Sequence, residues 1–110
     1  MKVNYFEYIK SEEWKQVRSR FYSSKMYKVL CESGKWSCYC CGEKNKPLDL
    51  HHRTYKRLGK ENIALDLVPV CRECHKEIHK LVPFVGNNIW GATKGIRRRK
   101  RRENNDLRGG

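Results

Sequence analysis

All four histidines of this 110-residue chain, and two Cys-x-x-Cys pairs, lie between positions 38 and 79. Imidazole nitrogen and thiolate sulfur are the groups that bind zinc and related metals in proteins. A cluster of both groups within one short stretch predicts metal binding. We expect this stretch to have two roles, one structural and one chemical.

The cysteine pairs Cys38/Cys41 and Cys71/Cys74 have the spacing of a structural zinc site. Four thiolates close a tetrahedron around one Zn²⁺ ion and leave no position for water, so such a site stabilises a fold and does not catalyse. Cys40 lies inside the first pair and is an alternative ligand. The Cys38/Cys41 spacing, however, lets backbone amides face both sulfurs.

The four histidines are left over if the cysteines bind one metal. His51 and His52 are adjacent at the end of an expected strand, and His75 and His79 are spaced to share one face of an expected helix. They could be further zinc ligands or surface residues, but the grouping favours an open, catalytic metal site. Imidazoles suit Zn²⁺, Ni²⁺, Co²⁺ or Mn²⁺, and Mg²⁺ can be used when a phosphate adds oxygen ligands.

Two helices are expected before the cysteine-rich region. Ser11 is an N-cap residue for a helix that places Trp14 and Phe21 on one face. A second helix is expected over residues 25–32, with Met26, Val29 and Leu30 facing inward, and ending at Gly34. Cys31 is expected to be a buried thiol on this second helix.

A hairpin and a helix are expected to carry the histidines. Residues 48–52 and 63–70 have the alternation and branched composition of two strands, and a helix is expected to begin at or just after Cys71. The element order is therefore strand, strand, helix. The fold class expected is α+β.

The chain carries 25 basic and 12 acidic residues, a formal net charge of +13. Such an excess predicts a polyanionic partner, and nucleic acid is favoured over an anionic membrane. No apolar run is long enough to span a bilayer, and no signal-peptide pattern opens the chain. The cysteine spacing without an export signal favours metal over disulfides, and hence a reducing cytoplasm.

Residues 94–110 hold eight basic and two acidic residues, a net charge of +6. We expect a disordered tail that acts as a DNA-binding arm, although a merely solubilising tail is an alternative. The residues expected to contact phosphates are Arg97, Arg98, Arg99, Lys100, Arg101 and Arg102. The rest, residues 1–93, is expected to be one domain, with a helical part over 1–35 and a zinc-binding ββα core over 36–82.

Two sequence patterns closely resemble those of HNH endonucleases. They are Leu-His-His-x-Thr-Tyr-x-Arg-Leu-Gly-x-Glu from residue 50 and Asp-Leu-Val-Pro-Val-Cys-x-x-Cys-His-x-x-Ile-His from residue 66. The resemblance covers residues 8–79 and is closest to small phage and bacterial members with zinc-binding cysteine pairs. It implies a ββα-metal (His-Me finger) fold that hydrolyses DNA phosphodiester bonds with one divalent ion.

The resemblance also implies a role for each histidine. His51 matches the first metal ligand, and His52 matches the general base. His75 matches the second metal ligand, and His79 matches a third ligand that some members have. Imidazole is suited to a general base because it titrates near neutral pH.

Asp66 stands where the family usually has its name-giving Asn, which is a departure from the pattern. A carboxylate there could accept the N–H of His52 and raise its basicity. We therefore expect Asp66 to orient His52, with Asn62 as a less well placed alternative.

The loop between the two strands carries a further group of residues that could bind DNA. A solvated charged loop is the alternative, and Arg is the better phosphate ligand of the two basic types. The residues are Tyr55, Lys56, Arg57 and Lys60.

These features predict a metal-dependent endonuclease that nicks or cuts double-stranded DNA with loose specificity, in the cytoplasm of a bacterium or a phage-infected host. The resemblance implies genome packaging beside terminase or portal proteins as one setting, and a mobile homing-type nuclease as another. One active site makes one nick, so a double-strand break needs a dimer or a partner, and monomer and dimer both stay open. The alternatives are a non-catalytic zinc-ribbon module that binds nucleic acid and a subunit that acts only inside a complex.

Overall fold

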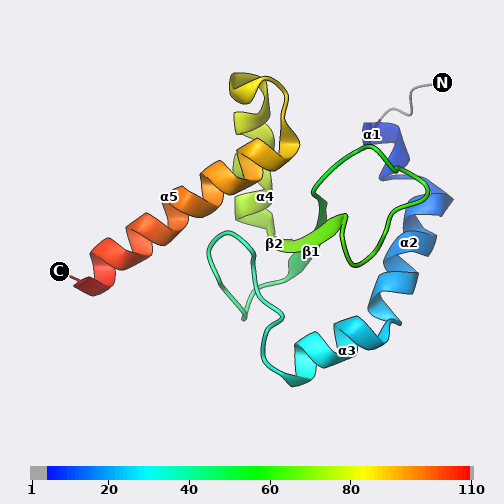
Figure 1. Ribbon diagram of the computed structural model, residues 1–110, viewed down its shortest axis with the longest axis horizontal. Helices are drawn as coiled ribbons and strands as arrows, with labels where there is room; N and C mark the ends of the chain where they lie inside the picture. The colour runs from blue at the N-terminus through cyan, green and yellow to red at the C-terminus, as the bar shows by residue number, and fades with distance from the viewer. Residues whose placement is uncertain (1–4, 110) are drawn as a thin grey trace.

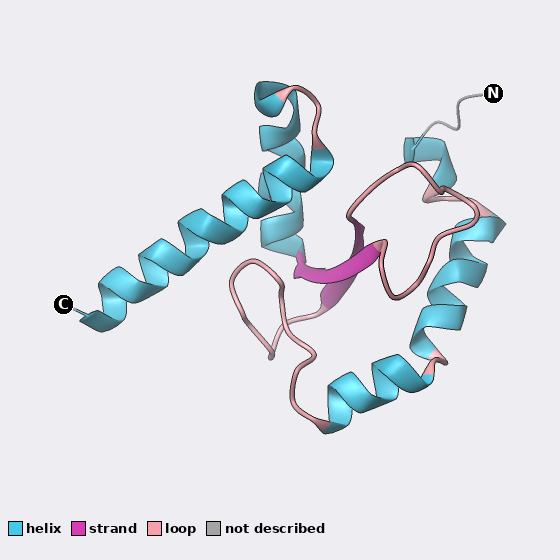
Figure 2. Ribbon diagram, viewed as in Figure 1, coloured by secondary structure: helices cyan, strands magenta, loops and turns pink. Residues whose placement is uncertain are grey.

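A two-stranded antiparallel sheet lies between two groups of helices in the computed structural model, which describes residues 5–109 (Figures 1 and 2). The elements in chain order are α1 (Tyr5–Tyr8), α2 (Glu12–Tyr22), α3 (Lys25–Glu32), β1 (Leu48–His52), β2 (Leu67–Cys71), α4 (Arg72–Leu81), the 3₁₀ helix η1 (Val82–Val85) and α5 (Ile89–Gly109). The fold class is α+β, as predicted, and the order β1, β2, α4 matches the expected strand, strand, helix.

Side-chain alternation along β1 sends the two adjacent histidines to opposite faces of the sheet. Leu50 packs with Leu67 of β2 against the buried ring of Trp14 on α2. His52 is paired with Leu67 across the sheet and lies on this same face. His51 lies on the other face, where it contacts His75 of α4. His52 therefore lies on the face of the sheet that packs against α2, and His51 lies on the face that packs against α4.

The helix α2 forms where the sequence predicts it. The Ser11 hydroxyl accepts the backbone N–H of Trp14 (3.2 Å), which caps the helix, and Trp14 and Phe21 are buried. In α3 the bounds are as expected, but Val29 is 51% exposed and Cys31 is exposed, so these two predictions were wrong. The ring of Tyr27, edge-on to Trp36, takes the inward position instead.

The second strand begins at Leu67, four residues later than predicted. Asn62 is the reason, because its side-chain oxygen accepts the backbone N–H groups of Ala64 and Leu65 (3.0 and 3.1 Å). Its carbonyl also accepts the N–H of Asp66 (2.8 Å). An Asx-type turn of this kind competes with strand pairing, so residues 62–66 form a turn.

The prediction of a disordered tail was wrong, since α5 runs from Ile89 to Gly109 as the longest helix and extends away from the sheet (Figure 1). Asn88 caps it by accepting the N–H of Gly91 (2.9 Å). Its apolar residue Ile96 packs in the core with Ile78 of α4. Among the described residues, no helix combines the length and the apolarity that a membrane crossing needs.

Candidate metal centres

The four cysteines predicted to bind zinc lie together. The sulfur atoms of Cys38, Cys41, Cys71 and Cys74 all lie within 4.8 Å of one another. The first pair is presented by a tight turn in which Gly42, at φ +81°, donates its N–H to the Cys38 carbonyl (2.8 Å). The N–H of Cys41 faces the Cys38 sulfur (3.5 Å), as expected for this spacing. Four sulfurs in this arrangement could hold one zinc ion.

Cys40, the alternative ligand, is outside this group. Its buried sulfur lies 3.7 Å from the carbonyl oxygen of Thr93 on α5. The neighbouring Cys38 sulfur raises the pKa of the Cys40 thiol to about 12. Cys40 is therefore a protonated core thiol that packs the turn against α5.

A second group of candidate ligands is formed by His51, His75 and His79, whose ring nitrogens lie within 4.8 Å of one another. β1 contributes the first residue and α4 contributes the other two from successive turns. The ring centroids of His75 and His79 are 4.8 Å apart, and His51 is edge-on to both. The structure thus brings together the three residues predicted as ligands of a catalytic ion.

Hydrogen bonding fixes which nitrogen of His51 is free. The Thr93 hydroxyl donates its only hydrogen to the Ile89 carbonyl (2.7 Å), so it must accept at its contact with His51 Nε2 (2.8 Å). His51 therefore carries its hydrogen on Nε2, and the buried Nδ1, which has no hydrogen-bond partner, has the lone pair.

The same logic holds for His75. Its Nδ1 lies 3.2 Å from a carboxylate oxygen of Asp49, which can only accept, so Nδ1 carries the hydrogen. The neutral ring then has its lone pair on Nε2, which is also buried and without a partner. Metal-binding histidines usually have their second nitrogen held in this way. The residues present therefore fit a divalent cation.

Burial keeps the imidazoles of His51 and His79 neutral, as metal ligands must be. It lowers the pKa of His51 to about 2, and the neighbouring His75 and His79 lower it further. Burial likewise lowers the pKa of His79 to about 4. Both rings are neutral near pH 7, so their nitrogen lone pairs are available.

The partner of His52 is Glu61 and not Asp66, so the prediction for Asp66 needs correction. His52 Nε2 lies 2.9 Å from a Glu61 oxygen, and both groups are buried. The Glu61 carboxylate also accepts the Tyr8 hydroxyl (2.7 Å) and the Gly59 N–H (2.8 Å). Because the carboxylate accepts from Nε2, the neutral His52 ring has its lone pair on Nδ1.

Asp66 is held by other groups in the same loop. Arg57 donates to both of its carboxylate oxygens, and the N–H of Asn62 donates to one of them (2.9 Å). The Arg57 guanidinium holds the pKa of Asp66 below its usual range. Asp66 therefore stabilises the loop. The Arg57 guanidinium donates its hydrogen bonds to Asp66, so those donors are not free to bind a DNA phosphate.

Tyr5 of α1 lies against the histidines. Its ring is stacked on His79 (centroids 5.7 Å apart), edge-on to His52 (5.7 Å) and close to Tyr55 (4.5 Å). The His75 side chain is reached through a pocket of about 330 Å³, which Tyr5, Asp49 and Arg72 also line. The histidine group is thus largely enclosed, and it opens to solvent at His75.

The basic residues predicted to bind DNA differ in their availability. In the loop, Lys56 and Lys60 are exposed. On α5, Arg99 and Lys100 pair with Glu77 of α4, and Glu77 raises the pKa of Lys100. Among residues 5–104, no acidic side chain pairs with the remaining four predicted residues, Arg97, Arg98, Arg101 and Arg102.

Three residues that hold the histidines were not identified from the sequence. Asp49 could have been, because it lies two residues before His51 and so on the same face of the strand. Glu61 is part of the Gly-x-Glu pattern but was given no role. Thr93 gave no signal, since the sequence predicts no helix or strand over residues 83–93.

Comparison with protein-family models, with curated proteins and with solved structures finds no match for this chain. The site itself consists of four thiols, which together can fill the coordination sphere of one metal ion, and three imidazoles, which would leave coordination positions free. A fourth imidazole beside these three is hydrogen-bonded to a buried carboxylate. Such a constellation can bind a cation with free coordination positions. Burial lowers the pKa of the His52 imidazole below its ordinary value, so the ring is neutral and its lone pair can accept a proton.

Proposed function

We propose that the protein is a metal-dependent endonuclease of the HNH type, with a ββα-metal fold, that hydrolyses phosphodiester bonds in double-stranded DNA. One observation carries the proposal. The unpartnered nitrogens of His51 and His75 belong to a three-imidazole group, and His52 beside it has its own lone pair set by Glu61. Three protein ligands leave coordination positions for substrate, unlike the four sulfurs of the cysteine group.

In the proposed reaction, His52 Nδ1 takes a proton from a water molecule as its oxygen attacks phosphorus. The bond from phosphorus to the 3′ oxygen breaks, and that oxygen takes a proton from solvent. Glu61 keeps the Nε2 hydrogen in place and stabilises the imidazolium that forms, as a carboxylate does beside a catalytic histidine. A divalent ion held by His51, His75 and His79 would neutralise charge on the scissile phosphate and the departing oxygen.

The charge of the chain supports DNA as the substrate. A net charge of +13 favours a polyanion, and phosphate contacts of this kind are independent of sequence. We propose loose recognition and one nick for each binding event, with a dimer or partner needed for a double-strand break. Genome packaging beside terminase or portal proteins, or the mobility of a homing-type nuclease, are the settings that the resemblance implies for this activity.

One observation favours a second candidate, a zinc-stabilised nucleic-acid-binding module without catalysis. The His52 side chain is completely buried, between Trp14 (centroids 4.6 Å apart) and Tyr5. A general base must reach a water molecule, and burial of the whole His52 side chain fits a module without catalysis better.

Supercoiled plasmid distinguishes the two candidates, with wild type and His52→Ala compared for nicking and for gel retardation. Loss of nicking with retardation intact supports the nuclease. Retardation by both proteins without nicking in any metal supports the binding module.

A further inference from the structure

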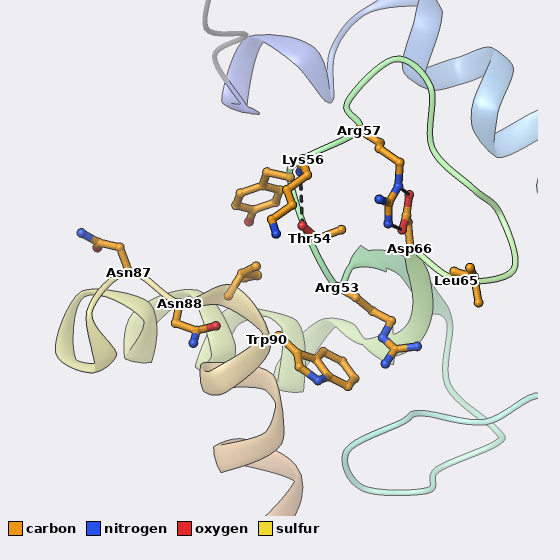
Figure 3. Close-up of a pocket in the computed structure, with 11 residues that line it drawn as sticks. Arg53, Thr54, Lys56, Arg57, Leu65, Asp66, Asn87, Asn88 and Trp90 are labelled. Carbon is orange, nitrogen blue, oxygen red and sulfur yellow. Dashed lines mark hydrogen bonds and ion pairs between the residues drawn. The ribbon is translucent and has the colours of Figure 1, made fainter.

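Four side chains form a row on the surface between the end of β1 and α5. The guanidinium of Arg53 lies over the Trp90 ring, 4.2 Å from its centroid (Figure 3). The ring centroids of Trp90 and Tyr39 are 5.3 Å apart. The guanidinium carbon of Arg97 lies over the Tyr39 ring, 4.4 Å from its centroid. We call these residues the Arg53–Arg97 row.

The two arginines of the row have no acidic partner among residues 5–104. This sets them apart from Arg57, whose fork is occupied by Asp66, and from Arg99, which pairs with Glu77. Stacking on a ring uses the flat face of a guanidinium and leaves its N–H groups free at the edge. Both arginines are therefore held in place with unused donors.

An open pocket of about 760 Å³ lies beside Arg53 and Trp90 (Figure 3). Its walls combine cations and polar groups, such as Lys56 and Asn88, with apolar side chains such as Leu65. Asp66 is the one carboxylate in the wall, and Arg57 neutralises it. The pocket therefore suits an anionic ligand with several oxygen acceptors.

We propose that the row and this pocket bind the sugar–phosphate backbone of DNA, with one phosphate at each stacked arginine. The proposal rests on the proposed function for its substrate. It places the backbone close to the histidines, because Arg53 directly follows His52 in the chain. Trp90 lies one turn before Thr93, which holds His51. A guanidinium can donate two parallel hydrogen bonds to a phosphate. Stacking on the aromatic rings already orders the arginine side chains, which reduces the conformational entropy lost on binding.

The test is the salt dependence of binding to a short fluorescein-labelled duplex of mixed sequence, measured by anisotropy on zinc-loaded protein without other added metal. Arg53→Ala and Arg97→Ala are each expected to bind roughly tenfold more weakly, the effect of one charge-assisted contact. Each should lower the slope of log K against log salt by about 0.9. Arg53→Lys should keep the slope but bind more weakly than wild type, because an ammonium lacks the planar fork.

The matched control is Lys28→Ala, which removes one exposed charge from α3 on the other side of the sheet. If the two arginine variants match this control in affinity and slope, the row is not a phosphate site. Plasmid nicking separates this result from failure of the proposed function. If wild type nicks plasmid but the arginine variants keep its salt slope, only the proposal for the row is rejected. If the variants have a lower salt slope but wild type does not nick plasmid in any metal, the row is a phosphate site and the nuclease proposal is rejected.

Discussion

Thr93 offers a sharp test of how the histidine group is built. Its hydroxyl is buried, accepts from His51 Nε2 (2.8 Å) and donates to the Ile89 carbonyl (2.7 Å). Thr93→Val keeps the shape of the side chain and removes the hydroxyl. The Nε2–H of His51 then has no acceptor, and the ring is free to adopt the other tautomer, which places a hydrogen where the lone pair was.

The expected effects follow from those contacts. Leaving one buried donor without a partner costs about 1–3 kcal/mol of unfolding free energy. Losing the hydrogen bond that orients a metal ligand typically weakens metal binding about 10- to 100-fold. Thr93→Ser retains the hydroxyl and should bind metal nearly as wild type does, despite the small cavity left by its missing methyl group.

Calorimetric titration of Ni²⁺ into zinc-loaded protein measures the affinity, and urea unfolding measures the stability. The reasoning predicts a loss in both for Thr93→Val and a rescue of Ni²⁺ affinity by Thr93→Ser. A Thr93→Val protein that is less stable but binds Ni²⁺ as tightly as wild type would show that Thr93 only packs the core, and would refute the assigned tautomer.

Three further predictions concern other parts of the site. Glu61→Gln should slow nicking by about 10²- to 10⁴-fold, the range for a general base, because an amide cannot accept every hydrogen that Glu61 now accepts; a larger loss in Asp66→Asn would contradict this assignment. Burial lowers the pKa of His79 to about 4 in the folded protein, so the stability that its neutral ring contributes is complete above about pH 6.5 and is lost as the pH falls. Because the ring is only half-buried and partly screened by solvent, the loss between pH 6.5 and pH 5 should be about 1 kcal/mol greater in wild type than in His79→Gln by urea unfolding; equal losses would refute it. Metal analysis should find at least one zinc ion per chain in wild type and a lower zinc content in Cys74→Ser, which should also melt at a lower temperature; unchanged zinc content in the variant would exclude the four-sulfur site.

Elements with strong local signals were predictable from the sequence. The strand Leu48–His52 has the alternation of a two-sided sheet, and α4 follows directly from a cysteine pair and the spacing of His75 and His79. The cysteine ligands followed from residue type and spacing, whereas the choice of three ligands among the four histidines followed from the resemblance to HNH endonucleases. These features depend on neighbours within a few residues, which is why pattern alone identifies them.

The features that were missed depend on contacts distant in sequence. The basic stretch of α5 has few apolar residues, and its helix is held by Ile96 in the core and by ion pairs to Glu77 of α4. Glu61 and Asp66 are both acids of one loop, and the sequence does not distinguish them. The choice of Glu61 for His52 is set by the Asn62 turn and by the Tyr8 hydroxyl, 53 residues away.

Cleavage of supercoiled plasmid is the most direct test of the nuclease proposal. Wild type, His52→Ala and Lys28→Ala would be compared in Mg²⁺, Mn²⁺, Ni²⁺ and Zn²⁺, with a metal-free lane for each. We predict metal-dependent nicking by wild type and Lys28→Ala, loss of nicking in His52→Ala with DNA retardation unchanged, and nicks that DNA ligase reseals because they end in a 3′ hydroxyl. Equal nicking by His52→Ala, or none by wild type in any metal, would contradict the assignment of His52 as the general base of a nuclease.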